Sequence, residues 1–158
     1  MGRRRRAVLK AILGVLVVLI AAGGYYFYKA RQSRPTEALR TGPLEKRVGG
    51  QEGIEELVHE FVGMLTKDER LRDRFTAIDR PGLEKRLSAF LCEQVGGGCK
   101  YEGKPMAEAH GELGITGEEF AAFMELFIVS MNNVELPQQE QNDLIDVMMA
   151  LEGSVVKE

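Results

Sequence analysis

The chain has 158 residues, 44% of them apolar and none of them tryptophan, a composition typical of one small globular domain with a short extension. All 24 acidic residues follow Arg34, and eight of the 21 basic residues lie within residues 1–34, so the remainder carries 13 basic against 24 acidic residues, a net charge of −11. So acidic a domain repels phosphate backbones, which excludes nucleic acid as an expected partner.

Residues 1–34 have the composition of a membrane anchor rather than of a folded domain. Five basic residues precede residues 11–28, a run of 18 residues without a charge that ends in four aromatic side chains. At about 1.5 Å per residue, such a run is just long enough to span a bilayer as one transmembrane helix. Fewer basic residues follow the run than precede it, which predicts a cytoplasmic N-terminus and a domain on the periplasmic side of the inner membrane.

The alternative interpretation of residues 1–34 is a cleaved secretory signal, which would release the domain into the periplasm. In either case residues 35–47, with Pro35, Gly42 and Pro43, read as a polar linker. The folded domain is then expected over residues 48–158.

Apolar residues recur at helical spacing soon after Gly49 and Gly50. They fall at i, i+3, i+4, i+7, i+8 and i+11, a wide stripe typical of a helix that packs on a core. The members are Ile54, Leu57, Val58, Phe61, Val62 and Leu65. His59 lies off this stripe and is interpreted as a surface residue.

Residues 66–75 are predicted to form a short turn of helix with Leu71 and Phe75 facing inward. Asp79 and Pro81 then signal a helix start, because aspartate can cap a helix and a proline in the first turn loses no hydrogen bond. The next apolar stripe consists of Leu83, Leu87, Phe90 and Leu91. Arg86 lies beside this stripe, where it is either a solvated surface charge or a partner for an anionic group.

Three glycines, residues 96–98, end this helix, and Cys92 and Cys99 bracket the break. A pair of cysteines is a weak signal for a structural zinc site, which needs four ligands. Outside the cytoplasm a disulfide is the better interpretation, because the glycines allow the loop to fold back and bring the two sulfur atoms together.

The candidate site lies in residues 101–120 and depends on one histidine. His110 falls four residues after Met106, so on a helix the two side chains share a face. A helix end is predicted at residues 111–114, and Thr116 with Glu119 three residues later forms the capping-box pattern of a new helix. An imidazole presented in this way to an apolar slot suits a haem iron. The alternative is a histidine that is satisfied within the core.

The rest of the chain is predicted to be helical. One apolar stripe comprises Phe120, Phe123, Met124, Phe127, Ile128 and Met131, and after Pro137 another comprises Leu144, Ile145, Met148 and Leu151. No Gly-rich phosphate loop, Ser/His/Asp set or paired-carboxylate motif is present in the sequence.

From about residue 48 to residue 152, the order of these pieces resembles the group 1 truncated haemoglobins, the short two-over-two helical globins. The resemblance rests on Tyr101-x-Gly103-x-x-Met106-x-x-x-His110, followed by Ile115, Thr116 and Phe120, and on the glycine pair before the first long helix. It implies an all-α truncated two-over-two globin fold, preceded here by a single N-terminal transmembrane helix. Two antiparallel helix pairs would then enclose haem b.

The resemblance also implies roles for individual residues. His110 would be the proximal iron ligand, Phe75 would pack against the porphyrin, and Arg86 would reach a propionate. The residues expected to contact the cofactor are Phe61, Val62, Phe75, Leu83, Arg86, Leu87, Met106, His110, Ile115, Phe120 and Phe123. Group 1 proteins often place tyrosine and glutamine, two hydrogen-bond donors, where this chain has Val62 and Leu87.

Three functions follow as hypotheses. The favoured one is a membrane-tethered haem protein that reversibly binds oxygen, carbon monoxide or nitric oxide at a five-coordinate iron. The second is a haem redox enzyme that acts on peroxide or nitric oxide with an unidentified reductase. The third is a haem-free helical interaction or sensor module.

Overall fold

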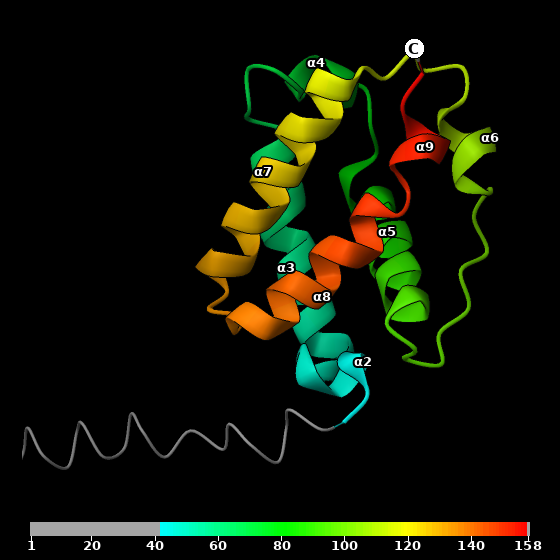
Figure 1. The fold of residues 1–158 in the computed structure, drawn as a ribbon. Coiled ribbons are helices and arrows are strands. Elements are labelled where there is room, and N and C mark those ends of the chain that lie inside the picture. The colour runs from blue at the N-terminus through cyan, green and yellow to red at the C-terminus, as the bar shows by residue number, and fades with distance from the viewer. Residues whose placement is uncertain (1–41, 158) are drawn as a thin grey trace, which may run out of the picture. The chain divides into compact units, whose positions relative to one another are not determined.

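A computed structural model of the protein describes residues 42–157, and all of the regular elements in this part are helices apart from one isolated bridge (Figure 1). The helices are α2 (Leu44–Arg47), α3 (Gly50–Leu65), α4 (Arg72–Phe75), α5 (Arg80–Gln94), α6 (Met106–His110), α7 (Gly117–Asn133), α8 (Gln138–Met149) and α9 (Glu152–Val155). The predicted transmembrane run, residues 11–28, lies outside the described residues. Within residues 42–157, no helix combines the length and hydrophobicity that crossing a membrane requires.

The four long helices form two pairs. Helix α5 runs back along α3, α8 returns from the end of α7, and α7 packs on α3 (Figure 1). The predicted stripe of α3 is confirmed, because Ile54, Leu57, Val58, Phe61, Val62 and Leu65 are all buried. The arrangement confirms the two-over-two globin fold for the described part of the chain.

Local signals in the sequence set several helix ends as predicted. Gly49 and Gly50 precede the body of α3 with φ of 93° and 68°, a left-handed conformation that glycine adopts without strain. Thr116 caps α7: its hydroxyl accepts from the Glu119 amide at 3.2 Å, and its own amide donates to the Glu119 carboxylate at 3.0 Å. Pro137 immediately precedes α8.

Two short helices differ from the sequence-based expectation. Helix α2 lies in residues expected to be a linker, and Arg47 ties it to α8 through Glu140 at 3.0 Å and Asp143 at 2.5 Å. Helix α9 continues the fold beyond residue 152, and Lys157 N donates to Ile115 O at 3.0 Å. This hydrogen bond therefore holds the segment between α6 and α7 against the residues that follow α9.

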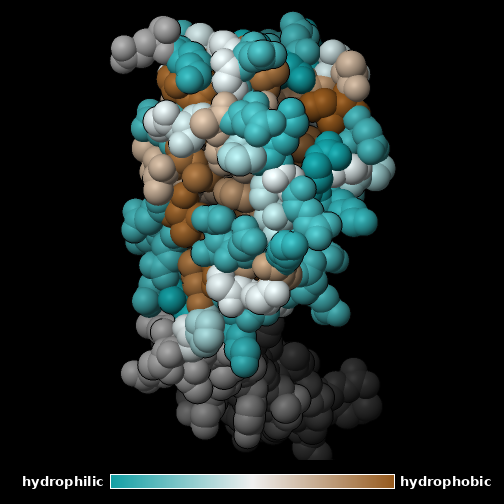
Figure 2. Space-filling view, turned by 90° about the vertical axis from the view of Figure 1, so that its right-hand side faces the viewer, coloured by the Kyte–Doolittle hydropathy of each residue, from teal (hydrophilic) through white to brown (hydrophobic). Residues whose placement is uncertain are grey.

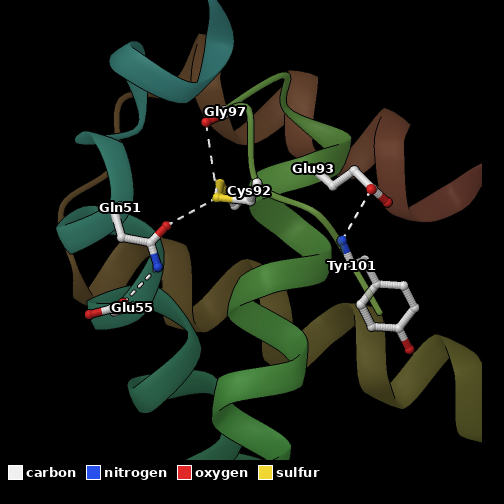
Figure 3. Close-up of a disulfide and its surroundings, with 7 residues drawn as sticks. Gln51, Glu55, Cys92, Glu93, Gly97 and Tyr101 are labelled. Carbon is white, nitrogen blue, oxygen red and sulfur yellow. Dashed lines mark hydrogen bonds between the residues drawn. A yellow bond between two sulfur atoms is a disulfide. The ribbon is translucent and has the colours of Figure 1, made fainter. Parts of the chain in front are cut away.

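The predicted disulfide between Cys92 and Cys99 is confirmed (Figure 3). It joins the last turn of α5 to the loop before α6, with the two Cα atoms 5.7 Å apart. Cys92 is buried, and Gln51 of α3 lies against the pair, with its side-chain oxygen 3.4 Å from Cys99 Sγ. Two residues later, the Tyr101 amide donates to the Glu93 carboxylate at 3.1 Å. The loop is thus held to α5 at two points.

We expect the double variant Cys92→Ala/Cys99→Ala to lose about 2.5 kcal/mol of unfolding free energy, because the natural crosslink removes the closure entropy of a loop of about eight residues from the unfolded chain. Urea unfolding followed by circular dichroism measures this loss. The single variant Cys99→Ala should lose nearly as much, since either change breaks the bond. Equal stability of the double variant and the natural chain would contradict a stabilising role.

Candidate functional site

A cavity of about 360 Å³ lies between α5 and α6 and is closed by α4, α7 and the C-terminal helices. Nearly all of its wall is apolar. The lining residues are Leu65, Leu71, Arg74, Phe75, Ile78, Leu83, Arg86, Leu87, Phe90, Tyr101, Met106, Ala109, His110, Leu113, Ile115, Glu119, Phe120, Phe123, Met148, Leu151 and Val155. Its volume is within the range of roughly 300–1,000 Å³ typical of small-molecule and cofactor sites.

The structure brings nine of the eleven predicted site residues to this cavity: Phe75, Leu83, Arg86, Leu87, Met106, His110, Ile115, Phe120 and Phe123. Phe61 and Val62 are not among the lining residues and lie fully buried in the core. Phe61 packs edge-on against Phe123 with ring centroids 4.7 Å apart, so it lies one layer behind the wall. From α3 only Leu65 reaches the cavity.

His110 is the one histidine of the cavity, and its hydrogen bond decides its chemistry. Nδ1 lies 2.9 Å from the carbonyl oxygen of Met106, one turn earlier in α6. A carbonyl oxygen can only accept, so Nδ1 must carry the proton and donate. The neutral ring then presents an unprotonated Nε2, and within the described part of the chain Nε2 makes no hydrogen bond. This is the tautomer that binds a metal, with a backbone carbonyl orienting the ring.

The segment that leads into α6 is fitted closely to α5. The Tyr101 ring packs edge-on against Phe90 with centroids 5.3 Å apart, and both residues line the cavity. A Cβ at Gly103 would lie 2.1 Å from the Tyr101 ring, so any larger residue there would displace the ring from its position. The spacing Tyr101-x-Gly103 therefore has a packing reason.

Two leucines of α5 line the cavity without offering a hydrogen-bond donor. Leu83 and Leu87 of α5 are half-buried and line the cavity together with Phe90. They are less buried than the rest of their stripe, as expected of side chains that face a cavity instead of packed neighbours. Dry apolar walls of this kind suit a flat apolar ligand.

Three charged side chains line the cavity: Arg74, Arg86 and Glu119. Arg74 donates to Glu119 at 2.8 and 3.0 Å. These bonds, together with that from the Thr116 amide, hold the pKa of Glu119 below its ordinary value, and the pKa of Arg74 is raised in turn. Arg86 forms no ion pair or hydrogen bond within residues 42–157, so its guanidinium is available to an anionic group.

Part of the cavity wall is also exposed. Ile78 and Leu113 line the cavity, yet 38% and 51% of their surfaces are accessible. On the side of the molecule that carries α6 and α9, hydrophobic side chains reach the surface between hydrophilic ones (Figure 2). A ligand with an apolar body and a charged edge would match such a wall.

Several lining residues were missed in the sequence. Leu65, Met148 and Leu151 belong to recognised stripes, but periodicity does not say which member borders a cavity. Tyr101 and Phe90 also lay in recognised patterns. For Arg74 the only available signal was its position directly before Phe75.

These residues fit haem. His110 offers one free imidazole nitrogen, the remaining wall is almost entirely apolar, and Arg86 supplies an uncommitted cation for a carboxylate edge. The cysteines, joined in a disulfide, are not available as thiolate ligands.

Comparison with known proteins agrees with this fit. Residues 44–157 match the family of bacterial-like globins. A group 1 truncated haemoglobin of Synechocystis is 30% identical over 115 residues, covering 70% of this chain and 90% of that protein. Another, from Mycolicibacterium paratuberculosis, is 26% identical and covers 66% of this chain and 77% of that protein.

Solved structures show the same fold. The truncated haemoglobin of Tetrahymena pyriformis in its Fe(III) form superposes with a TM-score of 0.69 at 23% identity, covering 73% of this chain and 98% of that one. The 2/2 haemoglobin of Synechococcus, with covalently attached haem, also superposes with a TM-score of 0.69. It is 20% identical, and the match covers 74% of this chain and 100% of that one. Haem, usually in its b form, is the cofactor of this family. With its family match spanning nearly all of the described residues, the chain belongs to the bacterial-like, truncated globins.

Proposed function

We propose that this chain binds haem b in the cavity, with His110 Nε2 as the proximal iron ligand, and reversibly binds a diatomic gas on the side of Leu83 and Leu87. Family membership implies haem-based gas binding, and the finer assignment rests on one observation. The bond from His110 Nδ1 to Met106 O makes Nε2 the lone-pair nitrogen of the neutral ring, beside an apolar cavity. When bound, haem supplies an iron that takes up oxygen, carbon monoxide or nitric oxide.

Different side chains of the cavity would hold different parts of the cofactor. Phe75, Met106, Ile115, Phe120 and Phe123 supply apolar surface for the porphyrin. Arg86 is placed to pair with a propionate, and a charge-assisted bond of this kind fixes orientation as well as adding affinity. His110 would supply the single protein ligand, so that the iron would keep a coordination position for a gas.

The residues of the gas side set the preference among ligands. Neither Leu83 nor Leu87 can donate a hydrogen bond, and Val62 lies in the core rather than at the cavity. Oxygen in a haem pocket is more polar than carbon monoxide, so an apolar wall retains oxygen poorly and is nearly indifferent to carbon monoxide. We therefore propose a fast oxygen off-rate, which favours neither oxygen storage nor efficient oxidation of nitric oxide.

The variant His110→Gly should lose most of its bound haem and the spectrum of five-coordinate ferrous protein, because no other imidazole reaches the cavity. Added imidazole should restore the spectrum if only the ligand was lost. Ultraviolet-visible spectra of the ferric, ferrous and carbon monoxide forms measure both effects, and His59→Gly, on the surface, is the matched control. An unchanged spectrum of His110→Gly would contradict the ligand assignment.

Leu87→Gln should slow oxygen dissociation by about ten- to a hundredfold, since a donor to a partly charged acceptor contributes about 1.5–3 kcal/mol and each decade of rate corresponds to about 1.4 kcal/mol. Carbon monoxide dissociation should change little. Stopped-flow mixing measures both rates, and Leu87→Met controls for altered packing. If glutamine leaves oxygen release unchanged, another donor already serves the pocket.

We further propose that residues 11–28 tether the domain to the periplasmic face of the inner membrane. The charge asymmetry around this run supports the proposal, and so does the disulfide, because disulfides persist in oxidising compartments. In this arrangement the globin domain meets gases and redox partners outside the cytoplasm.

Protease added to spheroplasts should release the globin domain from the membrane, whereas protease added to sealed inside-out vesicles should not. Immunoblotting of the membrane and soluble fractions separates these outcomes. Recovery of a soluble periplasmic chain that begins near residues 24–26 would indicate a cleaved signal instead.

A further inference from the structure

Arg74 makes four hydrogen bonds, two to the turn directly after α6 and two to the first turn of α7. Its Nη1 donates to Leu113 O at 2.7 Å and its Nη2 to Gly114 O at 3.3 Å. Its Nε and Nη2 also donate to the two oxygens of Glu119 at 2.8 and 3.0 Å. One guanidinium thus bridges α4, the turn after α6 and the first turn of α7.

The turn that Arg74 holds is connected directly to His110. Leu113 N donates to His110 O at 3.0 Å, so the carbonyl and the amide of Leu113 face Arg74 and His110 respectively. Gly114 then reverses the chain with φ of 57° before α7 begins. Helix α6 has only five residues and no side-chain cap at its start. So short a helix depends on contacts with other elements for its position, and among these is its packing against α9.

Glu119 strengthens this contact because its own position is fixed. Its carboxylate accepts from the Thr116 amide while its own amide donates to the Thr116 hydroxyl. Arg74 therefore binds an anchored carboxylate, in the two-point geometry that only arginine supplies. A typical surface ion pair between two mobile side chains contributes little. The Arg74 guanidinium instead binds a carboxylate that is already held in place, together with two backbone carbonyl oxygens.

We propose that Arg74 is a positioning residue for His110, acting through the turn at residues 111–114 to set how the imidazole approaches the haem iron. The proposal rests on the proposed function and deepens it. Loss of the guanidinium would free the turn and let α6 adopt a range of positions. The His110 imidazole would then face the iron in a wider range of orientations, while remaining its ligand.

Arg74→Ala should shift the iron–histidine stretching band of the ferrous, haem-loaded protein to lower frequency and broaden it in resonance Raman spectra. Exchange of the Leu113 amide, which donates to His110 O, should quicken by about tenfold, and haem transfer to an acceptor apoglobin by about three- to tenfold. Arg74→Lys should recover only part of each change, because one ammonium cannot reproduce the fork. Neither Raman nor exchange measures gas-binding activity.

Arg72→Ala is the matched control. Arg72 lies on the same short helix, is exposed, and makes only a 3.8 Å contact with its neighbour Asp73. Arg72→Ala should leave the iron–histidine stretching band and the amide hydrogen exchange unchanged. If Arg74→Ala proves too unstable to load haem, Glu119→Gln serves in its place, since it keeps an oxygen for the cap but removes the ionic fork, and an intermediate band shift is expected.

Three results distinguish a positioning role of Arg74 from direct contact with haem and from failure of the proposed function. Faster haem loss with an unchanged band and unchanged exchange would overturn the proposal and assign Arg74 to direct contact with the haem carboxylates. Identical band and exchange in Arg74→Ala and the natural chain would also overturn it. Absence of haem from the natural chain, or a normal spectrum of His110→Gly, would instead refute the proposed function on which the inference rests.

Discussion

The hydrogen bond from His110 Nδ1 to Met106 O determines which ring nitrogen can bind a metal in the cavity. It is made within one turn of α6, at 2.9 Å, and it commits Nδ1 to donating, so that the neutral form of the ring carries its lone pair on Nε2. A protonated ring would repel a metal ion, and the opposite tautomer would turn an N–H toward it. Because donor and acceptor share one helix, this choice requires only that α6 is formed. What depends on packing is where the lone pair is placed.

A five-residue helix is too short to be stable alone, so the surrounding contacts must place it. Before α6, the disulfide and the Tyr101 contacts with Glu93 and Phe90 hold the incoming loop to α5. After α6, Arg74 and the Ile115 bridge to Val156 hold the outgoing turn. The residues that make these contacts lie in separate parts of the chain. The site is thus built by long-range contacts around a short local motif.

This division explains how far the sequence could predict the structure. The stripe of α3, the capping box at Thr116 and the disulfide are encoded by short-range patterns, and each was predicted. Helices α2 and α9 have four residues each, too few to show a period. The Arg74–Glu119 bond spans 45 positions and has no local signature. Phe61 and Val62 show the same limit, because helical periodicity identifies an inward face but not which inward residues border a cavity.

The distribution of charge around the cavity has a consequence for how haem would be oriented. Residues 35–158 are strongly acidic, yet among residues 42–157 two arginines and one carboxylate line the cavity. Glu119 is already bound to Arg74, so within the described part of the chain Arg86 is the cationic side chain of the wall without such a partner. The two propionates lie on one edge of haem, and burying them away from a cation would be costly. This distribution of charge supports the proposal that Arg86 pairs with a propionate.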